Sequence, residues 1–130
     1  MYIETPKKVV EKSQKEVFEF LTDLKNFEQL MPDSIAKFEV INEDRFLFQL
    51  KGMPEIVLER KSQEQFNKIV LGAASEKLPF TLTADIEKLE ETKSEVQLNF
   101  SGEFNAMMAM MIKNPITNFM GTLSENLDKL

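Results

Sequence analysis

The sequence predicts an α+β fold in which an antiparallel sheet is followed by one long C-terminal helix. Between residues 36 and 100, apolar and polar residues alternate in six consecutive segments, which is typical of strands with one buried and one solvent-facing side. Residues 104–130 instead repeat their apolar positions with the period of an α-helix. A chain of 130 residues has the length of one domain, so we expect a single domain over 1–130.

The N-terminal part predicts one strand and two short helices. Residues 2–12 alternate loosely, and Pro6 places this first strand at an edge or a bulge. Ser13 and Glu16 have the spacing of a capping box, in which each side chain accepts a hydrogen bond from the other residue's amide. Asp23 restarts the helical pattern as a second N-cap, and the next proline ends the second helix.

The alternating segments predict which side chains form the buried face of the sheet. We expect strands at 36–41, 45–50, 55–64, 68–74, 80–90 and 95–100. Their inward positions include Phe46, Phe48, Leu58, Ile69, Leu71, Phe80 and Leu82. By the same parity, Arg60 also falls on the buried face. Its guanidinium either pairs with a ligand carboxylate at the end of a cavity or reaches water at the strand end, and we favour the second interpretation.

Composition excludes several classes of function. The chain has no cysteine and no histidine, which removes thiolate chemistry, the commonest general base and the commonest transition-metal ligand. Its net charge of −6, without a Lys/Arg cluster, argues against nucleic acid. No pair of acids falls on one inward face, so no acid–base constellation is visible. We expect no metal and no other cofactor.

The apolar segments are too short for a membrane span or a signal peptide. The longest apolar run covers about nine residues around the methionines, whereas a transmembrane helix needs roughly 20. The N-terminus has no apolar stretch of signal-peptide length. We therefore expect a cytoplasmic protein.

The C-terminal helix carries four methionines within five positions. With Phe104 as the centre of the buried face, a helical wheel turns Met107, Met108 and Met111 toward the sheet and Met110 away from it. The apolar stripe rotates near Pro115, which predicts a bend there because proline removes a helical hydrogen bond.

Three interpretations of these methionines are open. Thioethers hold Cu(I), but the lack of histidine and of an export signal weighs against a metal site. Methionines on a helix face are most often core filler. We favour a third interpretation between these two, in which the methionines form a flexible and polarisable wall that adapts to the shape of an apolar ligand.

With this order of one strand, two short helices, six strands and a long helix, the chain resembles the SRPBCC superfamily. This superfamily includes the START lipid-transfer domains, the birch-pollen allergens and polyketide cyclase/dehydrase-like proteins. The resemblance lies in "VVEKSQKEVFEFLTDLKNFEQLMPD" (9–33) and in the amphipathic helix 104–130. It implies a helix-grip fold: a curved antiparallel sheet of about seven strands that holds the C-terminal helix, with an apolar cavity between them. The chain lacks the glycine-rich loop of the pollen allergens and the iron-binding histidines of the ring-hydroxylating relatives.

The leading hypothesis is the binding of a hydrophobic or amphipathic small molecule of the lipid, isoprenoid or polyketide class. The alternatives are a polyketide cyclase/dehydratase-like enzyme built around Arg60 and an acid, or an interaction module in which Met110 and Met120 face a partner or a second copy in a homodimer. The expected ligand-binding residues are Phe46, Phe48, Leu58, Arg60, Ile69, Leu71, Phe80, Leu82, Met107, Met108, Met111 and Pro115.

Overall fold

The computed structural model describes residues 1–33, 35–74 and 79–129. Its eight strands are β1 (Tyr2–Glu4), β2 (Lys8–Val10), β3 (Ile35–Asn42), β4 (Arg45–Leu50), β5 (Ile56–Glu64), β6 (Lys68–Ala73), β7 (Phe80–Glu90) and β8 (Lys93–Gly102). Its helices are α1 (Gln14–Thr22), the 3₁₀ helix η1 (Leu24–Leu30), α2 (Ala106–Asn126) and the 3₁₀ helix η2 (Leu127–Lys129).

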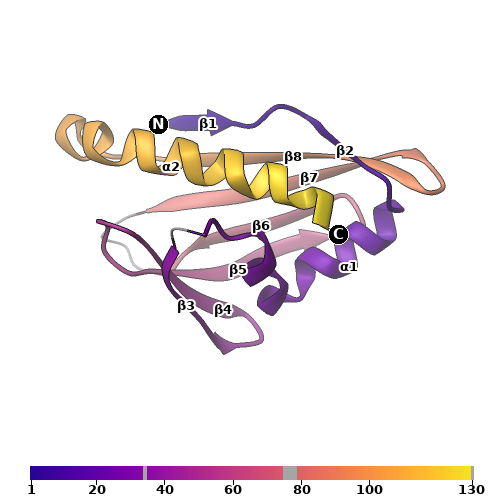
Figure 1. Cartoon of the computed structure of the whole chain (residues 1–130), viewed down its shortest axis with the longest axis horizontal. Helices are drawn as coiled ribbons and strands as arrows, with labels where there is room; N and C mark the ends of the chain where they lie inside the picture. The colour runs from indigo at the N-terminus through magenta and orange to yellow at the C-terminus, as the bar shows by residue number, and fades with distance from the viewer. Residues whose placement is uncertain (34, 75–78, 130) are drawn as a thin grey trace.

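All strand pairs are antiparallel, in the order β1-β8-β7-β6-β5-β4-β3, and β2 also pairs with β8. Figure 1 shows α2 lying along this sheet, with β1 on one side of it and β5 on the other. The predicted fold, an antiparallel sheet with a long C-terminal helix packed across it, is therefore confirmed.

The first strand differs from its prediction because it is split into β1 and β2. Both pieces pair with β8, in registers centred on Phe100 and Glu95. Between them, Thr5 still exchanges hydrogen bonds with Leu98 through its amide and its hydroxyl, each at 3.0 Å. Pro6 follows and has no amide to donate, so the pairing stops there.

The predicted capping box is present at the start of α1. The Ser13 hydroxyl accepts from the Glu16 amide at 3.1 Å, and the Glu16 carboxylate accepts from the Ser13 amide at 3.4 Å. Asp23 occupies the N-cap position of η1, but its side chain makes no capping hydrogen bond. Both helices turn their apolar residues inward, so the capped segment docks onto the sheet through Val17, Phe18, Leu21, Leu24, Phe27 and Leu30.

Helix α2 begins two residues later than predicted, because Asn105 caps it by accepting a hydrogen bond from the Met108 amide at 2.8 Å. The helix continues through Pro115 without interruption. Its second half packs on the sheet, where the Phe119 ring stacks on Phe48 at 5.0 Å between centroids. Residue 130, the predicted end of this helix, lies outside the described residues.

The centre of the molecule is a solid core. Phe46, Phe48 and Leu58 are fully buried on the face of the sheet that η1 and α2 cover. Between the sheet and Leu123 of α2, only about 10 Å³ of empty space is left. No ligand fits there, so any binding volume has to lie toward an end of the sheet.

Truncation of this core gives the first prediction. Phe48→Ala removes a ring that contacts Phe46 and Phe119, and we expect the free energy of unfolding to fall by about 3–5 kcal/mol. Urea unfolding followed by circular dichroism measures the loss. The exposed Val9→Ala variant is the control and should change stability by less than about 0.5 kcal/mol.

Candidate apolar binding site

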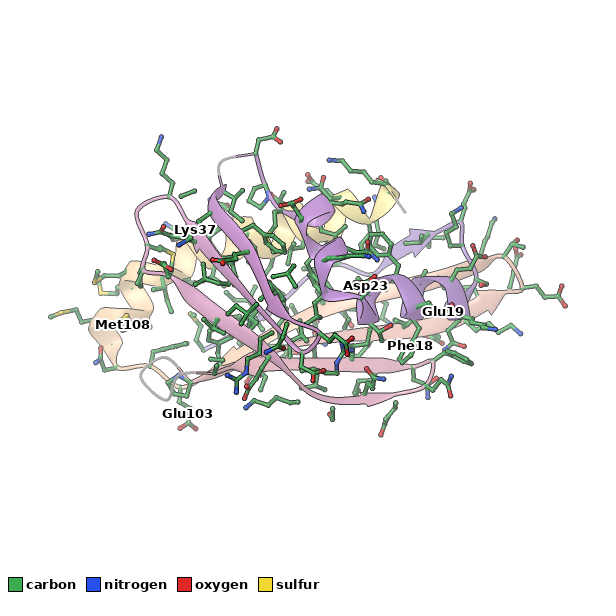
Figure 2. All side chains as sticks on the ribbon, turned by 90° about the horizontal axis from the view of Figure 1, so that it is seen from below. Phe18, Glu19, Asp23, Lys37, Glu103 and Met108 are labelled. Atoms are coloured by element: carbon green, nitrogen blue, oxygen red, sulfur yellow. The ribbon has the colours of Figure 1, made fainter. Side chains whose placement is uncertain are left out.

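A cavity of about 250 Å³ lies where α2 begins, between its first half, the β4–β5 turn and the adjoining ends of β7 and β8. Met108, labelled in Figure 2, is at this end of the molecule. The described lining is made almost entirely of apolar groups: Gly52, Met53, Pro54, Ile56, Phe80, Phe100, Phe104, Met108, Met111, Ile112 and Ile116.

Three phenylalanines form one wall of the cavity. The rings of Phe80 and Phe100 lie 4.9 Å apart at 28°, and those of Phe100 and Phe104 lie 6.3 Å apart at 12°. Gly102, opposite Phe80 on the neighbouring strand, makes this arrangement possible. A Cβ atom there would lie 2.7 Å from the Phe104 ring and 2.9 Å from the Phe80 Cβ.

The turn between β4 and β5 forms another part of the wall. Gly52 has a φ of +85°, a conformation that side chains with a Cβ rarely adopt. The Met53 amide donates to the Leu50 carbonyl at 3.0 Å, and the Gln49 side chain donates to the Met53 carbonyl at 2.9 Å. These bonds fix the turn, so Met53 and Pro54 face the cavity from a defined backbone.

The site can exclude water and contact an apolar surface. Among the described lining residues there is no ionisable side chain to transfer a proton or pair with a charge. In the described part of the chain, no group of three or more acidic residues could hold a metal ion either. The hypothesis of a cyclase-like enzyme therefore receives no support from these residues.

The two groups with clearly shifted pKa values lie outside the cavity. The pKa of Glu59 is lowered, chiefly because Lys61 donates a hydrogen bond to its carboxylate. The pKa of Tyr2 is raised, chiefly by its hydrogen bond to Glu4. Tyr2 is exposed and Glu59 is half-buried, but the lysine that pairs with Glu59 is open to water, and such pairs contribute little to stability.

The structure brings only part of the predicted site together. Phe80, Met108 and Met111 line the cavity. Pro115 borders a separate hollow of about 180 Å³ beside Lys51. The other strand positions lie in the solid core away from the cavity: Phe46, Phe48, Leu58, Ile69, Leu71 and Leu82.

The prediction that Met107 faces the sheet is wrong, since its side chain is 74% exposed, and Met111 is 68% exposed although it borders the cavity. Phe104, which served as the centre of the helical wheel, precedes the helix, and the buried face of α2 is centred instead on Ile112, Ile116 and Phe119. In addition, Figure 1 shows the first turns of α2 extending past the end of β1.

Sequence reasoning missed the turn residues 52–54 and the helix positions Ile112 and Ile116. Alternation does place Phe100 on the inward face, but parity cannot show which end of a strand borders empty space. The one available signal was Gly102 between two phenylalanines, since a glycine near the end of a strand often marks a close approach.

Arg60 lies outside the apolar cavity, beside a separate and largely open hollow of about 480 Å³ that it shares with Thr22, Lys25 and Glu43, and it acts there as a structural clamp. Its side chain is only 19% exposed and donates to the Thr22 and Glu43 carbonyls at 2.7 and 3.0 Å. It also donates to the Asp44 carboxylate at 3.1 Å and to the Gln63 side chain at 2.8 Å. The guanidinium thus joins the end of α1 to the β3–β4 turn, and these protein groups take the place of the water or ligand expected from the sequence.

The comparisons with known proteins establish the fold. No family model matches the sequence, and no curated protein matches it either. Among solved structures, a START superfamily protein from Mycobacterium smegmatis is 10% identical, with a TM-score of 0.73 over 98% of this chain and 94% of that one. Truncated norcoclaurine synthase from Thalictrum flavum is also 10% identical, with a TM-score of 0.78 over 99% of this chain and 91% of that one.

The protein therefore has the helix-grip fold of these START and norcoclaurine synthase structures, which confirms the architecture that the resemblance implied. A second structure of the Thalictrum flavum enzyme, in complex with dopamine and hydroxybenzaldehyde, has a TM-score of 0.77 at 10% identity, over 99% of this chain and 84% of that one. At such identities the likeness carries the fold alone. No helix in the described ranges is long and apolar enough to cross a membrane.

Removing the Arg60 clamp should affect stability and leave the cavity intact. We expect Arg60→Met to lower the free energy of unfolding by about 2–3 kcal/mol, because it leaves two backbone carbonyls without their charged donor. Denaturant unfolding measures the change. The control Lys25→Met changes a residue that borders the same 480 Å³ hollow as Arg60 but is paired only with Asp23 at the surface, and it should cost less than about 1 kcal/mol. A clamp variant as stable as the control would contradict the assigned role.

Two glycines provide a matched test of the aromatic wall. Gly102→Ala should destabilise the protein by about 1–3 kcal/mol, because the methyl group displaces Phe104 or Phe80. In Gly121→Ala the added Cβ meets nothing within 4 Å, and the variant should gain up to about 1 kcal/mol from helix propensity. Thermal unfolding of both variants shows whether their changes in stability have opposite signs, as the close approach at Gly102 requires.

Proposed function

We propose that the protein binds a compact apolar or amphipathic small molecule in the cavity between the first half of α2, the β4–β5 turn and the ends of β7 and β8. The observation that carries this proposal is an apolar space of about 250 Å³ beside an otherwise filled core. Native cores rarely keep voids larger than a water molecule, so an apolar hollow of this size favours a binding role.

The volume favours a small ligand. An apolar cavity of about 150 Å³ is enough for benzene, and drug-sized pockets start at about 300 Å³. The space here therefore suits one or two rings or a short isoprenoid better than a long acyl chain. Within the lipid, isoprenoid and polyketide classes, this supports the compact members.

The lining favours a ligand with a flat apolar body. The rings of Phe80, Phe100 and Phe104 offer stacking and edge contacts, and Met108 adapts its shape from the helix side. Because the described lining has no charged side chain, a polar group of the ligand has to point to the mouth. The fold likeness to a protein solved with two small aromatic compounds is consistent with this choice.

Native mass spectrometry of the purified protein, followed by titration with a panel of small aromatics, isoprenoids and fatty acids, tests the proposal. We expect saturable binding of compact lipophiles at one site and weaker binding of long-chain fatty acids. Absence of binding across the whole panel would overturn the assignment.

A cavity-filling variant connects binding to this site. Ile112→Phe places a ring in the cavity, so the affinity for a bound lipophile should fall at least about tenfold, or about 1.4 kcal/mol. Leu89→Phe adds the same ring at an exposed position near the distal end of β7 and should bind like the unmodified protein. Isothermal titration calorimetry measures both. Equal affinities would place the ligand elsewhere on the molecule.

A further inference from the structure

Three of the eight methionines of the chain line the apolar cavity. Met53 reaches it from the β4–β5 turn, and Met108 and Met111 reach it from the first half of α2. We call these three residues the cavity methionines. The chain has no cysteine, so thioethers are its only sulfur groups, and they are the side chains that a mild oxidant attacks when no thiol is present.

Solvent can reach the cavity methionines. Met111 is 68% exposed although it borders the cavity, and Met53 and Met108 are half-buried. By contrast, Met31 and Met120 are only 6% and 0% exposed in the packed core. Because a methionine is oxidised only where the oxidant reaches its sulfur, a dissolved peroxide should attack at the cavity and spare the core.

Oxidation turns an apolar group into a strong hydrogen-bond acceptor. A hydroperoxide transfers one oxygen atom to the thioether: a sulfur lone pair forms the S–O bond, the O–O bond breaks, and water or an alcohol leaves. The sulfur loses two electrons and the peroxide gains them. The product is methionine sulfoxide, a polar and chiral side chain that sulfoxide reductases return to the thioether.

The described lining has no side chain that can pair with a sulfoxide. Apart from the cavity methionines it consists of Gly52, Pro54 and aliphatic or aromatic residues. A sulfoxide that faces the cavity loses its hydrogen bonds to water when an apolar ligand enters, which costs free energy. A sulfoxide that turns to solvent instead withdraws the contacts that the thioether made with the ligand. Either orientation therefore weakens binding.

We propose that oxidation of the cavity methionines by a hydroperoxide switches the site from strong to weak binding of apolar ligands, and that reduction of the sulfoxides restores it. This inference rests on the proposed function, since it concerns the affinity of the same cavity. Met107 and Met110 are 74% and 82% exposed but are not among the described lining residues, so oxidation there should leave the affinity unchanged.

The sites of oxidation are found by treating the whole chain with dilute hydrogen peroxide and mapping its peptides by mass spectrometry. We expect sulfoxide first at the exposed positions of α2, including Met111, and then at the half-buried Met53 and Met108. The core residues Met31 and Met120 should stay unmodified while circular dichroism shows a folded protein.

Indole is a suitable probe of the affinity. It has two fused rings, and the chain has no tryptophan whose fluorescence would overlap with that of indole. Fluorescence titration before and after oxidation measures the dissociation constant. We expect the oxidised protein to bind indole at least about tenfold more weakly, and treatment with methionine sulfoxide reductases to recover the original constant.

Two sets of leucine substitutions assign the effect to the cavity. Met53→Leu/Met108→Leu/Met111→Leu leaves no sulfur in the described lining, so the affinity that this variant has before oxidation should change less than about twofold on peroxide treatment. The control Met107→Leu/Met110→Leu removes two thioethers outside the lining and should lose affinity on oxidation as the unmodified protein does.

Several results would overturn the switch. These are equal affinities before and after oxidation of the cavity methionines, oxidation confined to Met107 and Met110, or a triple variant that loses as much affinity as the unmodified protein. A loss of affinity that coincides with unfolding in circular dichroism would reject it as well. If the untreated protein binds neither indole nor any compound of the panel, the proposed function itself fails, whereas binding that peroxide does not change rejects the switch alone.

Discussion

The structure depends on how the second half of α2 packs into the sheet. Phe119 stacks on Phe48, and Leu123 closes the space above Leu71 and Leu82. This contact is tight enough to leave no usable void, and the Asn126 side chain secures it by donating to the Leu30 carbonyl at 2.8 Å. Because the helix is held at this end, its first half reaches the end of the β7–β8 pair, where Ile112 and Ile116 are buried and also border the cavity.

That arrangement explains why the apolar cavity is at one end and not in the middle. The central residues are fully interlocked, whereas the first half of α2 faces the end of the β7–β8 pair and a turn fixed by Gly52. Gly102 allows the Phe104 ring to approach the strand backbone beside Phe80. The cavity is therefore built by a few backbone constraints around a helix whose position is set elsewhere.

The sequence predicted what depends on periodicity and local chemistry. Alternation located six strands and the inward parity of Phe46 and Phe48, and the Ser13–Glu16 spacing located the start of α1. The sequence pattern could not place the cavity, because the parity of a position distinguishes the two faces of a strand but not its two ends. The orientation of Met107 failed because the helical wheel was centred on Phe104, which precedes the helix. Met107 comes five residues before the buried Ile112, which places it about 140° away from the buried face.

The position of Arg60 has a consequence for how this protein can change. Its clamp and the packed half of α2 hold the part of the molecule away from the cavity, while the cavity walls include the half-buried Met108 and the exposed Met111. Residues that determine the fold and residues that determine ligand preference are thus largely different residues. Substitutions around the mouth can alter which molecule is accepted without removing the contacts on which folding depends, so ligand specificity can diverge quickly while the architecture is retained.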